Sequence, residues 1–454
     1  MVNLLNPRSI AVIGATDRKG SVGRGIMENL LNGAVFMTRH ASPFKGHIYP
    51  VNPKAVSILG KKAYPSVNHI PGVVDLAIIA VPAKIVPEVA KECVEKKIPY
   101  AIIISAGFHE AGKEGQNLQD EVRRISRGKM RIVGPNCLGI LRPGSFNGSF
   151  APTMPPVGHV GFITQSGALA DSIIDWSIEE RYGFSSIISY GNAMDLDVSD
   201  FIEMLGNDSK TKVITLYIEG ILNGEKFMRI ASKVSKKKPI IALKAGRTSA
   251  GSKAIGSHTG SLAGNYAVYE EAFSQSGVIL ADTVEEMFDT AKALAHQPPL
   301  KKPLVIVTNG GGCGVLAADY CEELGVPLAV LKESTLKKLD NSGVMHPAYS
   351  RRNPLDIVGD ALPERYEAAL DILLSDSDVG GAIVIQTLQT MTDPVKDAQI
   401  VVKMRKKYPK KPIVCAYMGG RFSKAGILYL EEHGVPDYND PRKAALAMRA
   451  LHSR

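Results

Sequence analysis

The clearest indication of the fold class is the stretch Lys236-Lys-Lys-Pro-Ile-Ile-Ala-Leu-Lys-Ala-Gly246. A basic run and a proline lead into a short apolar run, and a glycine turn follows. The same order recurs at residues 96–107, 301–310 and 410–419. Runs that are apolar throughout, rather than alternating, are typical of strands buried on both faces. The pattern predicts an α/β, doubly wound fold with mostly parallel sheets.

The chain length predicts several domains. It has 454 residues, and a domain usually takes about 150. Two stretches rich in turn-forming residues, 142–156 and 296–303, have the composition of linkers. We therefore expect three α/β domains: residues 1–145, 146–298 and 299–454.

Composition restricts the possible partners. The net charge is +9, but the lysine runs precede strands, where they complement helix C-termini rather than nucleic acid. No apolar run reaches about 18 residues, and no signal peptide is visible at the start. Five scattered cysteines indicate neither disulfides nor structural zinc. We expect a cytoplasmic protein with no nucleic-acid partner, no membrane partner and no bound metal.

The first domain indicates an anionic ligand. A strand ending at Gly14 runs into a glycine-rich loop and a helical pattern, an arrangement that suits phosphate. The spacing is not the GxGxxG of NAD sites. The second strand ends in Asn52-Pro53-Lys54, where an NAD site needs an acidic residue. An amide and a cation suit a 3′-phosphorylated ribose, as in coenzyme A.

Three more strand ends in this domain carry small or polar residues, which belong at the ligand crevice of such a sheet. The alternative is that any fold of this kind needs these turns. The candidate cofactor-binding residues are Gly14, Ala15, Thr16, Gly20, Ser21, Val22, Gly23, Val51, Asn52, Pro53, Lys54, Val81, Pro82, Ala83, Ser105, Ala106, Gly107, Asn136 and Cys137.

His258 is the candidate catalytic residue of the second domain. It lies in a Gly-Ser-His-Thr-Gly frame ahead of a helical pattern, and a helix N-terminus stabilises a phosphoryl group. Glu219 ends a strand and could orient the imidazole; the alternative is a structural histidine. The candidate phosphate-binding residues are Gln165, Ser166, Gly167, Ser257, Thr259 and Gly260.

The third domain has a glycine loop from Asn309 to Cys313 between a strand and a helix. It could hold an anion through its backbone amides. It could equally be a tight turn at a subunit contact.

Taken together, these motifs resemble the α subunit of ADP-forming acetyl-CoA synthetase (acetate–CoA ligase, ADP-forming), in the NDP-forming acyl-CoA synthetase superfamily and known chiefly from archaea. The resemblance rests on the glycines at 14–23, Ala80-Val-Pro-Ala83, Gly134-Pro-Asn-Cys137, Thr164-Gln-Ser-Gly167, Glu219-Gly220 and Gly256-Ser-His-Thr-Gly260. It implies a Rossmann-like CoA-binding domain followed by two flavodoxin-like CoA-ligase domains.

The resemblance also implies a reaction: acetyl-CoA, ADP and phosphate give acetate, ATP and CoA. In that scheme an acyl phosphate phosphorylates His258, and Glu219 steadies the phosphohistidine. CoA or acetyl-CoA and phosphate bind this chain. No ATP-grasp pattern is found, so ADP or ATP with Mg²⁺ is expected on a separate ATP-grasp β subunit, in an α₂β₂ assembly.

Four alternatives stay open at this point. The acyl group could be branched-chain, aryl or succinyl. The chain could be a non-catalytic CoA-binding protein, although the pairing of Glu219 with His258 counts against that. An NAD oxidoreductase lacks its acidic residue at Asn52, and a protein acetyltransferase lacks a further domain for the transfer.

Overall fold

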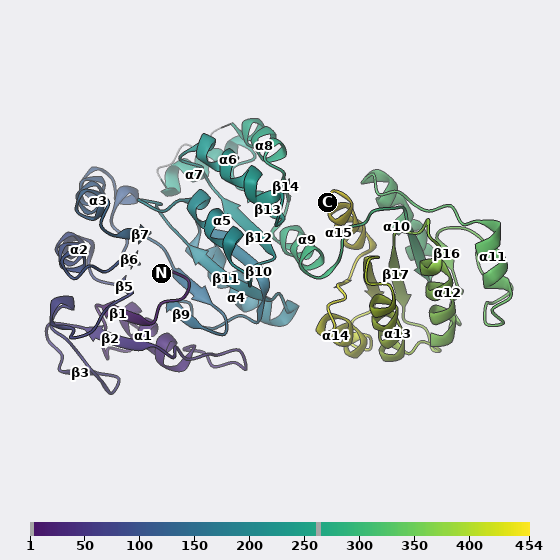
Figure 1. Ribbon diagram of the computed structural model, residues 1–454, viewed down its shortest axis with the longest axis horizontal. Coiled ribbons are helices and arrows are strands. Elements are labelled where there is room, and N and C mark those ends of the chain that lie inside the picture. The colour runs from purple at the N-terminus through teal and green to yellow at the C-terminus, as the bar shows by residue number, and fades with distance from the viewer. Residues whose placement is uncertain (1–3, 260–264) are drawn as a thin grey trace. The chain divides into compact units, whose positions relative to one another are not determined.

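The computed structural model describes the backbone of residues 4–259 and 265–454, with their side chains except those of 256–259. Contacts define two compact units, residues 1–282 and 283–454. Each is built from helices around mostly parallel sheets (Figure 1), which confirms the predicted α/β class.

The first sheet of unit 1 is wholly parallel, in the order β2-β1-β5-β6-β7. Its strands are β1 (Ser9–Ile13), β2 (His47–Val51), β5 (Leu76–Ile79), β6 (Tyr100–Ile103) and β7 (Arg131–Val133). The helices are α1 (Val22–Asn32), η1 (Val67–His69), η2 (Ala83–Ile85), α2 (Val86–Glu95), η3 (His109–Ala111) and α3 (Lys113–Ser126), and β3 (Ser57–Ile58) pairs with β4 (Lys61–Lys62).

Two glycines of the predicted loop are required by close packing. Gly14 has a φ of +93°, and a Cβ there would lie 2.3 Å from the Ala80 carbonyl oxygen. A Cβ on Gly23 would lie 2.0 Å from the Gly14 oxygen. These glycines let α1 pack closely on the end of β1, as in dinucleotide-type folds.

The second sheet has the order β14-β13-β12-β10-β11-β8-β9. Its strands are β8 (Gly139–Arg142), β9 (Phe146–Ser149), β10 (Val157–Thr164), β11 (Phe184–Ser189), β12 (Val213–Ile218), β13 (Ile240–Lys244) and β14 (Val278–Leu280). Its helices are α4 (Gly167–Glu180), α5 (Val198–Asn207), α6 (Gly224–Ser235), α7 (Ser249–Thr259) and α8 (Tyr266–Gln275).

The first expected linker is partly a hairpin. Strands β8 and β9 pair antiparallel and extend the second sheet beside β11. Between them, Ser145 N–H donates to the Arg142 oxygen, with Pro143 in the second position and Gly144 (φ +74°) in the third. That is the pattern of a type II turn. The same Pro-Gly pair that indicated a linker therefore closes a hairpin, and β9 is wholly buried.

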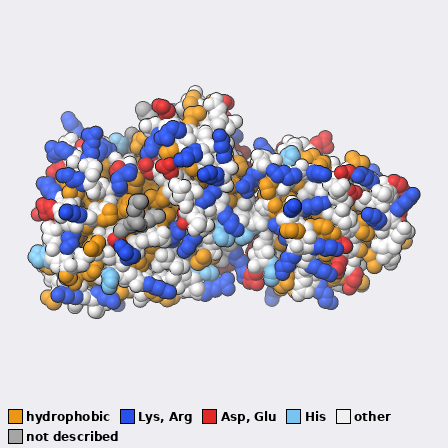
Figure 2. Space-filling model, viewed as in Figure 1, with side chains coloured by type: hydrophobic (Ala, Val, Ile, Leu, Met, Phe, Trp, Pro, Cys, Tyr) orange, Lys and Arg blue, Asp and Glu red, His pale blue; other side chains and the backbone are white. Residues whose placement is uncertain are grey.

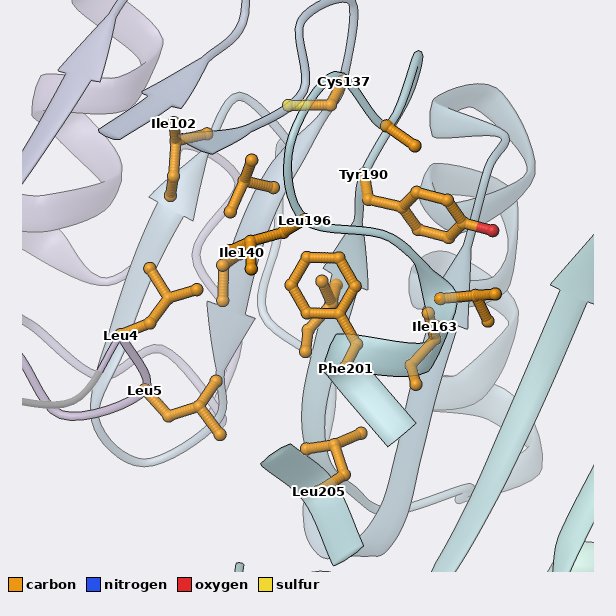
Figure 3. Close-up of a cluster of buried hydrophobic side chains, with 14 of the residues drawn as sticks. Leu4, Leu5, Ile102, Cys137, Ile140, Ile163, Tyr190, Leu196, Phe201 and Leu205 are labelled. Atoms are coloured by element: carbon orange, nitrogen blue, oxygen red, sulfur yellow. The ribbon is translucent and has the colours of Figure 1, made fainter. Parts of the chain in front are cut away.

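One hydrophobic core serves both sheets of unit 1. Ile102 of β6 and Cys137 lie in the same buried cluster as Ile140 and Ile163 of the second sheet and Phe201 of helix α5 (Figure 3). Because this core is continuous, the two sheets form one compact unit, with no division in contacts near residue 145.

Unit 2 contains the third sheet, parallel in the order β16-β15-β17-β18-β19. Its strands are β15 (Leu304–Thr308), β16 (Leu355–Asp356), β17 (Gly381–Thr387), β18 (Ile413–Met418) and β19 (Asp437–Tyr438). Its helices are α9 (Val284–His296), α10 (Gly311–Glu323), α11 (Glu333–Asp340), α12 (Pro363–Ser375), α13 (Pro394–Lys407), α14 (Lys424–Glu432) and α15 (Pro441–His452).

The division in contacts between the two units falls after Asp282, and the domain boundary near residue 298 stays a prediction. Helix α9 packs against α15, so it belongs to unit 2. The second expected linker follows it and is tied to the same unit: Gln297 Nε2 donates to the Gly434 oxygen, and Leu300 N–H donates to the Leu451 oxygen.

All three sheets share one topology. Counting the parallel strands along the chain, each runs 2-1-3-4-5. Ligands of such sheets bind where the strand order reverses, outside the carboxyl ends of strands 1 and 3. In the second sheet these ends are Thr164 on β10 and Ile218 on β12.

The basic side chains are dispersed over the visible face of the molecule (Figure 2). Lys238 donates to the oxygens of Leu205 and Asp208 at the end of α5. Lys411 likewise donates to Leu374 and Asp376 at the end of α12. These lysines stabilise helix C-termini, although on neighbouring helices rather than their own. Among the described residues, no helix is long and apolar enough to cross a membrane.

Candidate active site

A cavity of about 1120 Å³ lies in unit 1 at the carboxyl ends of strands from both sheets. Its walls include the loops that come directly after β5, β6 and β7 of the first sheet. They also include the loops after β10, β11 and β12 of the second sheet. The structure thus brings together predicted cofactor-binding and phosphate-binding residues. Those that line it are Val22, Val81, Pro82, Ser105, Ala106, Asn136, Cys137, Gln165, Ser166, Gly167 and Glu219.

The remaining first-domain candidates lie outside the cavity wall: Gly14, Ala15, Thr16, Gly20, Ser21, Gly23, Val51, Asn52, Pro53, Lys54, Ala83 and Gly107. Asn52 joins two of their loops, because its Nδ2 donates to the Ala15 oxygen at 2.8 Å and its Oδ1 accepts from Lys54 N–H at 2.9 Å. The loops after β1 and β2 are therefore held together by this amide.

The start of α4 presents backbone donors to the cavity. Thr164 Oγ1 accepts from Ser166 N–H at 3.0 Å, and Ser166 Oγ caps the helix by accepting from Leu169 N–H at 3.2 Å. The amides of Gly167 and Ala168 precede the first intrahelical hydrogen bond, and both residues line the cavity. Such amides, with the positive end of the helix dipole, bind anions.

The Glu219 loop is fixed from two sides. Gln165 Oε1 accepts from the N–H groups of Glu219 and Gly220, at 2.5 and 2.9 Å. Lys244 Nζ, at the end of β13, donates to the Glu219 oxygen at 2.9 Å and to the Ala245 oxygen. Glu219 is 7% exposed and lines the cavity. Its backbone is thus held at a defined place beside the α4 N-terminus.

Lys244 is a buried cation, 4% exposed. Its Nζ lies 4.4 Å from the ring centroid of Tyr269, whose hydroxyl accepts from Ile221 N–H. Burial lowers the pKa of Lys244, and the Glu219 carboxylate opposes that effect. The two side chains therefore interact electrostatically as well as through the backbone.

The ionisable side chains in the cavity wall are His109, Glu110, Asp171, Glu219 and Cys137, and burial raises the pKa of the Cys137 thiol to about 12. Burial acts to raise the pKa of Glu110, but hydrogen bonds from Asn192 and from the Gly107 amide outweigh it and lower the pKa. The described wall includes no lysine or arginine. The backbone amides at the start of α4 are therefore donors that the described wall offers to an anion.

For His258, the predicted phosphate carrier, the structure describes only the backbone. The side chains of Ser257, His258 and Thr259 lie outside the described residues, as does all of Gly260. The helix that was predicted after His258 is present as α8, which begins at Tyr266. His258 itself lies in the last turn of α7, where the sequence had indicated a loop. Thr248 caps the start of α7, because its Oγ1 accepts from Gly251 N–H.

Sequence reasoning missed several cavity residues: Leu138, Phe150, Asp171, Asn192, Ile221 and Leu222. Leu138, Ile221 and Leu222 lie just beyond motifs that it did single out. Asp171 is one helical turn past Ser166-Gly167, and that spacing was the available signal.

The glycine loop of unit 2 repeats the α4 geometry. Thr308 Oγ1 accepts from Gly310 N–H at 3.0 Å, as Thr164 does from Ser166. Asn309 bridges the ends of β15 and β17. Its Oδ1 accepts from Thr387 N–H at 2.7 Å, and its Nδ2 donates to the backbone oxygen of Thr387 at 2.9 Å. Its side chain therefore fastens the end of β17.

Three family models match the chain. A CoA binding domain covers residues 8–143, a succinyl-CoA ligase like flavodoxin domain covers 157–294, and a ligase-CoA domain covers 304–452.

Among relatives, the chain is 42% identical to acetate–CoA ligase [ADP-forming] I subunit alpha of Pyrococcus furiosus, over 99% of this chain and 96% of that protein. It is 43% identical to acetate–CoA ligase [ADP-forming] I of Archaeoglobus fulgidus over 99% of this chain, but spans only 63% of that protein's length.

Among solved structures, it is similar to the dinucleotide forming acetyl-coenzyme A synthetase 1 of Ca. Korarchaeum cryptofilum, in complex with phosphate and ADP. The TM-score is 0.92 and the identity 36%, over 100% of this chain and 97% of that one. The chain therefore belongs to the family of ADP-forming acetate–CoA ligase α subunits.

Proposed function

We propose that this chain is the acyl-CoA-handling, phosphohistidine-carrying part of an ADP-forming acetate–CoA ligase. The reaction is acetyl-CoA, ADP and phosphate to acetate, ATP and CoA. Residues 1–145 bind CoA, 146–298 carry His258, and 299–454 form a second CoA-ligase-type domain. The observation that supports this most is the cavity, because it joins the carboxyl edge of a CoA-type sheet to Glu219 and the α4 N-terminus.

In this scheme, phosphate binds at the amides of Gly167 and Ala168 and attacks the thioester carbonyl. The carbon–sulfur bond breaks, CoA leaves as the thiol, and acyl phosphate forms. His258 then takes the phosphoryl group and acetate leaves. Glu219, held by Gln165 and Lys244, orients the imidazole by accepting its ring N–H. Negative charge is met by backbone amides, whose positions are fixed before the reaction.

The phosphoryl group must then reach ADP. We infer that ADP or ATP and Mg²⁺ bind on a separate ATP-grasp β subunit, in an α₂β₂ assembly. The Pyrococcus furiosus relative is named a subunit alpha, which supports a partner chain. No residue of the described cavity is assigned to the nucleotide.

The test is ATP formation by this chain mixed with an ATP-grasp chain, with acetyl-CoA, ADP and phosphate supplied. We expect ATP to appear only when all five components are present. If no acyl-CoA supports ATP formation although both chains are correctly folded, the proposal is contradicted.

A bulkier acyl group is the second candidate. Leu138, Phe150, Ile221 and Leu222 give the cavity an apolar side, which favours more than a methyl group. Replacing acetyl-CoA with branched-chain, aryl and succinyl thioesters in the same assay ranks the acyl groups by kcat/KM.

A further inference from the structure

Asp171 is a cavity residue with no assigned role. It lies in the second turn of α4 and lines the same cavity as Gly167 and Ala168. Its Oδ1 is buried, and no group among the described residues donates a hydrogen bond to it. Buried polar atoms are nearly always hydrogen-bonded, so this carboxylate is short of donors among the described residues, and a ligand in the cavity that donated to its other oxygen would stabilise the ionised form.

The position of Asp171 on α4 indicates which part of a ligand it meets. Gly167 faces the segment after β7, because a Cβ there would lie 3.5 Å from Leu138 Cβ. Asp171 is four residues further along and therefore on the same stripe of the helix. Phe150, whose N–H donates to the Leu138 oxygen, lines the same cavity. The carboxylate thus lies on the side of α4 that is turned toward the first sheet.

We propose that Asp171 is a CoA-binding residue whose carboxylate accepts a hydrogen bond from an amide N–H of the pantetheine arm. This rests on the proposed function, which brings the thioester to the N-terminus of α4. Asp171 lies about 6 Å along the helix from Gly167. In CoA the nearest amide nitrogen is two methylene groups from the thiol sulfur, and its hydrogen bond of about 2.9 Å to an acceptor adds to that reach.

Two further observations agree with this role. Burial raises the pKa of Asp171 to about 6, so the group is still mostly ionised at neutral pH and acts as an acceptor. The first sheet, which Asp171 faces, carries Val81, Pro82, Ser105 and Ala106 in the wall of the same cavity. A pantetheine arm that entered along those loops would pass the carboxylate before its thiol reached Gly167.

The test measures CoA binding to the full chain by calorimetry, for wild type, Asp171→Ala, Asp171→Asn and Asp175→Ala. Asp175 is exposed on the same helix and is the matched control. We expect Asp171→Ala to weaken free CoA and every acyl-CoA alike, by about tenfold or more, as for a hydrogen bond to a charged group. Asp171→Asn keeps an acceptor oxygen but loses the charge, so its affinity should fall between those of Asp171→Ala and wild type.

A second readout separates binding from folding and from chemistry. Acetyl phosphate can phosphorylate His258 without CoA in the proposed scheme, so that half-reaction should fall much less in Asp171→Ala than CoA binding does, and it should be unchanged in Asp175→Ala. Wild-type CoA affinity in Asp171→Ala would overturn the inference. So would a loss confined to hydroxyl-bearing acyl-CoAs, which would assign Asp171 to the acyl group. A wild-type chain that binds no CoA would instead overturn the proposed function.

Discussion

Replacing Lys244 by methionine should slow catalysis more than it weakens substrate binding. Methionine keeps the apolar stem but removes the ammonium that donates to the oxygens of Glu219 and Ala245. It also removes the cation over Tyr269. Glu219 would lose one of the two supports of its backbone, while the Gln165 support and the CoA loops stay intact.

The size of the effect follows from these contacts. Each hydrogen bond from a charged donor contributes about 1.5–3 kcal/mol. Part of this loss is offset in the variant, because the protein no longer has to bury an ammonium group. A net loss of about 1–3 kcal/mol in holding Glu219 corresponds to a fall in kcat of roughly 5- to 150-fold. The KM for acyl-CoA should change little.

The assay compares kcat, KM and thermal unfolding in Lys244→Met and Lys238→Met. Lys238 is the matched control, because it precedes the same strand, has a pKa lowered by burial and also donates to two backbone oxygens, but far from the cavity. Both variants should lose stability, and only Lys244→Met should lose kcat. Equal kcat in both variants would show that Lys244 is merely structural.

Two other substitutions test particular contacts. Arg142→Met leaves Asp208 without its buried partner, 2.8 Å away, and should cost about 3–5 kcal/mol in urea unfolding. Burial would raise the pKa of Asp208, but hydrogen bonds from Arg142 and Thr211 lower it. The pair therefore stabilises the fold above about pH 4 and is lost on acidification; unchanged acid stability in the variant would refute this. Asn52→Asp removes the donor to Ala15 and adds a negative charge at the expected ribose phosphate. It should raise the KM for CoA about tenfold, and an unchanged KM would remove Asn52 from the CoA site.

The sequence predicted the sheets well because their strands are continuously apolar. It also located the residues that follow the strands, since the ends of parallel strands carry the ligand loops. Gln165, Ser166 and Glu219 therefore come together as their order implies.

It could not predict features that depend on tertiary packing. Pro143-Gly144 has the composition of a linker, but the partner strand β11 turns it into a hairpin. Helix α9 precedes the predicted domain boundary, and its packing on α15, far along the chain, depends on tertiary structure. The sequence pattern of α4 does not distinguish Asp171 from other polar helix residues. Only its place in the cavity wall indicates a role.

In the proposed function, His258 carries the phosphoryl group. The most direct test of this role is the chemistry of the phosphate on the wild-type chain, His258→Ala and His69→Ala after incubation with acetyl phosphate. His69 is exposed and lies outside the cavity. We predict acid-labile, base-stable phosphate on wild type and His69→Ala, and none on His258→Ala. Equal phosphorylation of His258→Ala would contradict the claim.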